Sequence, residues 1–176
     1  MSRRMITFIN IAVGKRYAGA TAHEKRVGNW LKQAGFKDVT FQPNGINNHP
    51  DWKARDGKKW IEIECKTSKK SEIMFNDTLP PKETLYVFSS EYHNDTMVFY
   101  GGDVFKKWIY RKIDEYKKQS KVLGDRFVKE CLNNKRSNPF GFIPGNRCCL
   151  RQRGGASSDF FSAKTTLVNK ARARNR

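Results

Sequence analysis

The sequence predicts an α/β fold in which helices flank a central mixed sheet and a basic segment follows. Three observations predict it. Apolar residues recur at helical spacing in residues 17–36, an Asp-Gly turn signal separates two alternating segments at residues 56–57, and short β-branched and aromatic runs occupy residues 84–89 and 96–100. A chain of 176 residues is long enough to bury one real core, so we expect a single compact domain.

The first clear helix is predicted over residues 17–36, after an apolar run at residues 5–13 that reads as a short strand or helix. Thr21 is a possible N-cap, and Gly35 stands where a helix would stop. The apolar positions of this helix are Ala22, Val27, Trp30, Leu31 and Ala34. We expect its one histidine, His23, at the surface.

A hairpin is predicted next, because residues 50–55 and 59–67 flank Asp56-Gly57 and such a pair readily supplies a tight turn. Side chains alternate across a strand. One face of the second strand therefore carries Ile61, Ile63 and Cys65, and the other carries Glu62, Glu64 and Lys66. In the first strand Trp52 and Ala54 lie opposite Asp51, Lys53 and Arg55. One face of the hairpin belongs to the core, and the other presents acids and bases.

Two buried strands are predicted at residues 84–89 and 96–100, followed by a helix that Asp103 can cap and that ends near residue 119. Trp108 falls on the apolar face of this helix and is expected in the core. A second, weaker helical pattern runs through Phe127.

The charge balance predicts a polyanionic partner, with nucleic acid first among the candidates. The chain carries 35 Lys and Arg against 17 Asp and Glu. The composition changes after residue 134, so we divide the chain into a core (1–134) and a basic DNA-contacting segment (135–176). Within that segment Arg147, Arg151 and Arg153 are expected to contact DNA, and the last residues, 169–176, are expected to stay mobile until they meet phosphate.

Cysteine spacing and hydropathy indicate a cytoplasmic protein without a zinc site or a membrane span. The four cysteines form no CxxC pair, and no apolar run approaches the length needed to cross a bilayer.

The polar face of the hairpin carries the groups that phosphodiester hydrolysis needs. Two carboxylates, Asp51 and Glu64, can hold Mg²⁺, which prefers hard oxygen ligands. The ammonium of Lys66, two residues after Glu64, can orient or help to deprotonate the attacking water. A tight turn brings these residues of neighbouring strands together.

These residues resemble the motif of the PD-(D/E)XK nuclease superfamily. The motif here is Pro50-Asp51, twelve intervening residues, then Glu64-Cys65-Lys66. An upstream helix with an acid (Glu24), the hairpin, further strands and a following helix extend the resemblance over residues 17–120. Within the superfamily the chain is most similar to small type II restriction endonucleases, partly because of residues 75–80, and this implies a restriction-endonuclease-like sheet.

The resemblance implies roles for individual residues. Asp51 and Glu64 would ligate Mg²⁺ together with the backbone carbonyl of Cys65, Lys66 would position the water, and Glu24 would act as an outer or second-metal acid. The products would carry 5′-phosphates. Directly after the motif, Ser68, Lys69 and Lys70 are candidates for holding phosphates of the scissile strand, or form a solvated loop.

Three functions remain open at this point. The first is a site-specific endonuclease of restriction or homing type, which as a homodimer would cut both strands of double-stranded DNA. The second is a structure-specific or repair nuclease such as a junction resolvase. The third is a non-catalytic nucleic-acid-binding protein in which the acids and bases of the hairpin form ordinary cross-strand ion pairs. His49, next to Pro50, reads as a loop residue that either decorates the surface or contacts phosphate or base.

Overall fold

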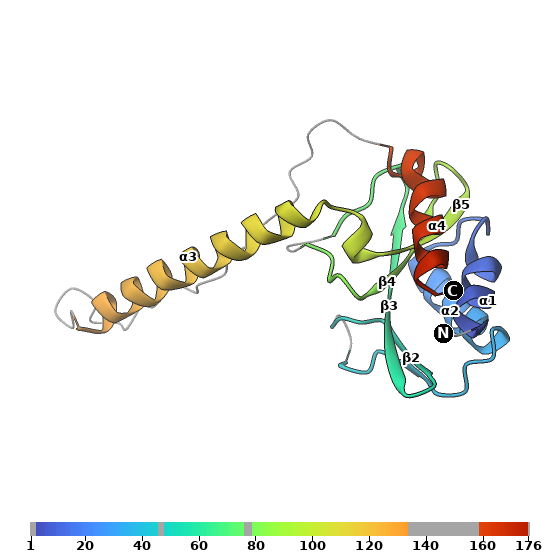
Figure 1. Cartoon of the computed structure of the whole chain (residues 1–176), viewed down its shortest axis with the longest axis horizontal. Coiled ribbons are helices and arrows are strands. Elements are labelled where there is room, and N and C mark those ends of the chain that lie inside the picture. The colour runs from blue at the N-terminus through green and yellow to red at the C-terminus, as the bar shows by residue number, and fades with distance from the viewer. Residues whose placement is uncertain (1–2, 46–47, 76–78, 134–158, 176) are drawn as a thin grey trace. The chain divides into compact units, whose positions relative to one another are not determined.

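The computed structural model describes residues 3–45, 48–75, 79–133 and 159–175 (Figure 1). These residues form an α/β fold with one five-stranded mixed sheet and four α-helices, as the sequence predicts at this level. The chain divides into two compact units. The first consists of Met1–Asn76, Pro80–Val104 and Gln152–Arg176 and contains the whole sheet, whereas the second consists of Asp77–Leu79 and Phe105–Arg151.

The sheet has the strand order β1-β2-β3-β4-β5, so each strand lies beside its neighbour in sequence. The strands are β1 (Val39–Phe41), β2 (Trp52–Asp56), β3 (Lys59–Ser68), β4 (Leu85–Ser90) and β5 (Asp95–Tyr100). All neighbours pair antiparallel except β3 and β4, which are parallel. The strands β4 and β5 are buried along almost their whole length, as their β-branched and aromatic composition predicts.

The hairpin of β2 and β3 forms with the predicted alternation but turns one residue later than expected. Asp56 pairs with Lys59, so the two turn residues are Gly57 and Lys58. Gly57 has φ +61°, the conformation that a turn with glycine at its first central position requires. Because Ala54 pairs with Ile61, the predicted apolar face is kept.

The helices α1 (Arg3–Ala12), α2 (Ala20–Gln33) and α4 (Lys164–Arg174) lie together on one side of the sheet (Figure 1). The apolar run near the N-terminus is therefore a helix and not a strand. The N-cap of α2 is Gly19, not Thr21. The buried residues of α2 recur every three or four positions and face the sheet: His23, Val27, Gly28, Trp30 and Leu31.

The helix α4 corrects the expectation that the end of the chain is mobile. Its residues Leu167, Val168 and Ala171 are buried, and it packs against β5 and α1. Two of its cations bind within the protein, since Lys164 pairs with Asp95 and Arg174 with Asp103.

In the second unit, α3 (Lys107–Asn133) joins the two expected helices into one helix of 27 residues. Asp103 lies in a short 3-10 helix, η1 (Gly101–Asp103), and does not cap α3 as predicted. The side chain of Trp108 is 56% exposed, so the expectation that it belongs to the core is wrong. None of the described helices is both long and apolar enough to cross a membrane.

Candidate active site

The first acid of the motif is joined to the middle of the Glu-x-Lys sequence on the neighbouring strand. Oδ2 of Asp51 accepts a hydrogen bond of 2.7 Å from the backbone N–H of Cys65. The register of the hairpin explains this contact, because Trp52 pairs with Ile63 and the preceding residue, Asp51, therefore lies beside Glu64 and Cys65. The hairpin thus brings Asp51 to the residue between Glu64 and Lys66.

Glu64 and Lys66 form an ion pair on the polar face of β3. The Lys66 Nζ lies 2.9 Å from Oε1 of Glu64, and the two side chains are 20% and 13% exposed. A neighbouring pair on the same face, Lys53 and Glu62, is joined at 3.3 Å with exposures of 31% and 40%. The motif pair is therefore shielded from water more than the adjacent pair, and charge interactions are stronger where water is excluded.

His49 is part of this cluster, which the sequence did not reveal. Its Nδ1 lies 2.8 Å from Oε2 of Glu64, and its Nε2 lies 3.1 Å from Oγ1 of Thr84. A weaker contact of 3.7 Å joins Nε2 to Glu62. The partners of the ring are 15 and 35 residues away in sequence. Its position next to Pro50-Asp51 was therefore the one sequence signal that His49 belongs to the site.

Glu24 approaches the site from α2. The indole Nε1 of Trp52 donates a hydrogen bond of 3.2 Å to the Glu24 carbonyl, which ties α2 to the residue after Asp51. The negative charge of Glu24 acts on Asp51 and on Cys65. Close packing is possible here because α2 has a glycine against the indole: a Cβ on Gly28 would stand 2.4 Å from Trp52 Cη2.

The environment of Asp51 opposes its negative charge. Burial raises the pKa of Asp51 to about 6, the hydrogen bond from Cys65 counteracts part of this rise, and the charges of Glu64 and Glu24 add to it. Burial also raises the pKa of the Cys65 thiol, so that side chain stays neutral. If Cys65 ligates a cation, its backbone carbonyl and not a thiolate is the ligand.

The donor set suits Mg²⁺. Within the described residues no three His, Cys, Asp or Glu side chains are already grouped to hold a metal. Mg²⁺, however, keeps several waters and needs only one or two carboxylates from the protein. Each carboxylate oxygen has about two lone pairs, and the contacts to Asp51 Oδ2, Glu64 Oε1 and Glu64 Oε2 each use one. A divalent cation would also relieve the repulsion among the acids.

The predicted DNA-contacting residues fall in two places. Ser68 ends β3 two positions after Lys66, and alternation puts it on the same face. Its Oγ accepts a hydrogen bond of 3.1 Å from the Lys70 N–H, and the side chains of Lys69 and Lys70 are exposed. Arg147, Arg151 and Arg153 lie outside the described residues, as do residues 76–78 of the stretch that follows the motif.

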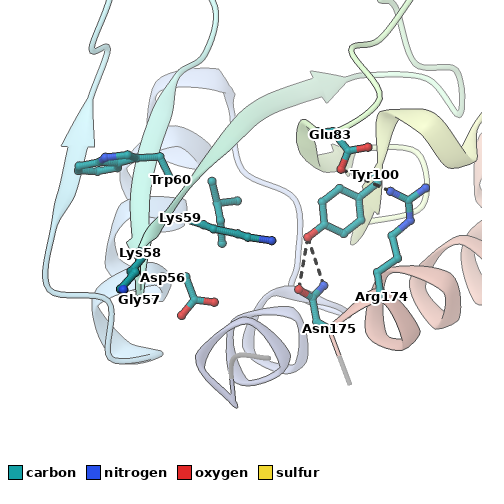
Figure 2. A pocket seen from close by; sticks show the side chains of 10 residues that line it. Asp56, Gly57, Lys58, Lys59, Trp60, Glu83, Tyr100, Arg174 and Asn175 are labelled. Atoms are coloured by element: carbon teal, nitrogen blue, oxygen red, sulfur yellow. Dashed lines mark hydrogen bonds and ion pairs between the residues drawn. The ribbon is translucent and has the colours of Figure 1, made fainter.

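A groove of about 800 Å³ lies at the turn end of the hairpin and contains none of the predicted site residues. One wall contains Tyr100, Arg174 and Asn175, which together with Asp103 form a polar group that we name the C-terminal clasp. Figure 2 shows Tyr100 and Asn175 facing each other, with Asn175 Nδ2 3.2 Å from the Tyr100 hydroxyl and the ring of Trp60 turned away. The Arg174 guanidinium lies 5.0 Å from the centre of the Tyr100 ring and 2.9 Å from Asp103. These contacts fasten the end of α4 to the end of β5.

Comparisons with protein-family models, with curated proteins and with solved structures found no match. A function for this site therefore rests on the geometry of this chain.

Proposed function

We propose that this protein is a Mg²⁺-dependent endonuclease that hydrolyses DNA phosphodiester bonds with Asp51, Glu64 and Lys66. The observation that carries the proposal is the bond from the Cys65 amide to Asp51, because it holds one acid against the Glu-x-Lys sequence of the next strand. Lys66, ion-paired with Glu64, completes the set of two acids and one amine. Burying a carboxylate that two other acids repel costs stability, so a hairpin with only a structural role is not expected to contain one.

The chain's own residues have separate tasks in this reaction. Asp51, Glu64 and the Cys65 carbonyl would hold the ion, which when bound would neutralise charge that develops on the phosphate. The Lys66 ammonium, ion-paired with Glu64, orients the attacking water and stabilises the hydroxide that forms when this water loses its proton to solvent. Glu24 tunes the charge of the site from α2, or serves a second ion. Cleavage on the 3′-oxygen side of the phosphate leaves 5′-phosphates.

The order of elements supports placing the fold among restriction-endonuclease-like nucleases. The acid-bearing helix α2, the hairpin, the strands β4 and β5 and the helix α3 follow one another as that resemblance implies. The net charge of +18 supports double-stranded DNA as the substrate. We propose site-specific cleavage of both strands by a homodimer, with Ser68, Lys69 and Lys70 on the scissile strand.

Incubating the protein with supercoiled plasmid, in Mg²⁺ or in EDTA, tests the activity. Cleavage is expected in Mg²⁺ alone, and Glu64→Gln is expected to abolish it because the variant lacks one charged ligand. Glu62→Gln is the matched control, since Glu62 lies on the same face of β3 two residues earlier and pairs with Lys53. Equal activity in Glu64→Gln and the wild type would place the site elsewhere.

The same assay separates the three functions. Discrete plasmid fragments support a site-specific endonuclease, and cleavage restricted to branched DNA supports a resolvase-type enzyme. Retarded migration of DNA without cleavage in any metal would identify a binding protein and reject the nuclease.

A further inference from the structure

The ring of His49 bridges the acid Glu64 and the hydroxyl of Thr84, a buried residue directly before β4. The Nδ1 contact to Glu64 is 2.8 Å, and the Nε2 contact to Thr84 is 3.1 Å. Thr84 is 1% exposed, so this end of the bridge is held inside the protein. We propose that His49 is a positioning residue that fixes the Glu64 carboxylate for metal binding, an inference that rests on the proposed nuclease function.

The partners determine the directions of the hydrogen bonds. An ionised carboxylate only accepts hydrogen bonds, so Nδ1 of His49 must carry a hydrogen and donate it to Glu64. In the neutral ring Nε2 is then the acceptor, and the Thr84 hydroxyl donates to it. Glu64 thereby selects the tautomer of the neutral ring, and Thr84, whose hydroxyl can donate or accept, holds the ring in this orientation, as outer partners do for the histidines and carboxylates around metal ions.

Together with Lys66, His49 occupies both oxygens of Glu64. Lys66 holds Oε1 at 2.9 Å and His49 holds Oε2 at 2.8 Å. Two donors on different oxygens fix the plane of the carboxylate, whereas one donor leaves it able to rotate. Because a ligand displaced by about 1 Å can lower activity by about 10²-fold, fixing this plane matters for catalysis.

The backbone of His49 is itself anchored. Asn44 Nδ2 donates a hydrogen bond of 2.7 Å to the His49 carbonyl, and Asn48 Nδ2 donates one of 2.8 Å to the Asn44 carbonyl. On the other side the Gln42 N–H binds the Asp51 carbonyl at 2.7 Å. The segment that presents His49 and Asp51 is therefore held in place before any metal arrives.

The test compares the Mg²⁺ dependence of cleavage, and Mg²⁺ affinity by titration calorimetry, in a set of variants. His49→Ala is expected to raise the half-saturating Mg²⁺ concentration by about 10–100-fold, the usual range for partners of metal ligands. His49→Asn keeps an N–H near the position of Nδ1 and is expected to restore most of this loss. Thr84→Val removes only the hydroxyl and is expected to give a smaller shift in the same direction.

His93→Asn is the matched control, because His93 also contacts a carboxylate, Asp159 at 2.8 Å, and is not part of the site. A merely structural His49 would lower the melting temperature in its variants without moving the Mg²⁺ dependence, and Asn would not rescue it. Cleavage by His49→Ala with wild-type Mg²⁺ dependence would overturn the inference. A wild type that neither cleaves DNA nor binds Mg²⁺ would instead reject the nuclease function, and the role of His49 with it.

Discussion

Two polar clusters in the first compact unit differ in how their charges are balanced. In the C-terminal clasp the two opposite charges pair with each other: Arg174 binds Oδ1 of Asp103 and covers the Tyr100 ring, and the Tyr100 hydroxyl meets the Asn175 amide. Oδ2 of Asp103 is buried without a hydrogen-bond partner among the described residues, although the charge of this carboxylate is balanced by Arg174. At the candidate site Glu64 pairs with Lys66 and His49, whereas the charges of Glu64 and Glu24 act against that of Asp51, whose pKa is raised mainly by burial.

We infer from this difference that the clasp is structural and that the candidate site serves the proposed function. Folding explains the clasp, since its contacts attach α4 to β5 and leave charges paired. Folding does not explain the candidate site, because burying the ionised Asp51 near two other acids makes the folded protein less stable at neutral pH. Perturbed ionisable groups of this kind collect at sites of catalysis and binding, where the function requires them. The contrast can be tested by changing one cluster at a time.

The largest effect is expected for Lys66→Met. Removing the amine that orients the water should lower the cleavage rate by about 10²–10⁴-fold, the usual contribution of a positioned acid or base. Lys53→Met is the matched control, because Lys53 forms its ion pair with Glu62 on the same polar face. Plasmid cleavage rates at saturating Mg²⁺ measure both variants, and comparable losses in the two would mean that Lys66 acts only through general positive charge.

Gly28→Ala tests the packing that supports the site. An added Cβ would stand 2.4 Å from the indole of Trp52, which must move, and Trp52 is the neighbour of Asp51. Overpacking costs about 1–3 kcal/mol, which equals or exceeds the roughly 1 kcal/mol that alanine contributes to a helix relative to glycine. We expect lower stability in urea denaturation and slower cleavage. Asn29→Ala, at an exposed position of the same helix, should leave cleavage unchanged and raise stability slightly, because alanine favours the helix more than asparagine does.

The sequence predicted those parts of the molecule that local patterns determine. Alternation gave the two faces of the hairpin, and the Pro50-Asp51 and Glu64-Cys65-Lys66 motif gave the residues that the fold brings together at the Asp51–Cys65 hydrogen bond. The turn was displaced by one residue because Gly57 suits either central position of a two-residue turn.

Other parts were missed because distant partners determine them. His49 reads as a loop residue until β3 and β4 bring Glu64 and Thr84 to its ring. His23 was expected at the surface, yet it is 1% exposed and its Nε2 lies 3.0 Å from the Val87 carbonyl. Its place four residues before Val27 on the apolar stripe of α2 was a usable signal. The basic composition of residues 164–174 suggested a DNA-contacting segment, but these residues form α4, in which Lys164 and Arg174 pair with acids of the protein.

The raised pKa of Asp51 predicts a pH-dependent difference between the wild type and Asp51→Asn in EDTA. A carboxyl whose pKa is about 6 when folded, and near 3.8 when unfolded, contributes stability below about pH 4 and loses it as the pH rises through 6. Asp51→Asn avoids this loss. Because the side chain is partly exposed, we expect the variant to be more stable by only about 1 kcal/mol at pH 8.

Thermal unfolding between pH 4 and 8 measures this difference, which should shrink as the pH falls through 6. Mg²⁺ should reverse the order at pH 8, because it stabilises the wild type by binding the folded state and the variant lacks the charged ligand. A difference that is independent of both pH and Mg²⁺ would show that Asp51 is an ordinary structural acid.

Tyr100→Phe is expected to have the smallest effect, and it tests the other side of the comparison. The variant loses the contact between the hydroxyl and Asn175, but Asn175 Nδ2 keeps its hydrogen bond of 2.7 Å to the Ala171 carbonyl, and the ring still lies under Arg174. The free energy of unfolding should therefore fall by only about 0.5–1.5 kcal/mol. Cleavage at temperatures well below unfolding should equal that of the wild type, because the clasp only attaches α4. A tenfold slower cleavage by a fully folded Tyr100→Phe protein would mean that the clasp takes part in the reaction, and the division between a structural and a functional cluster would fail.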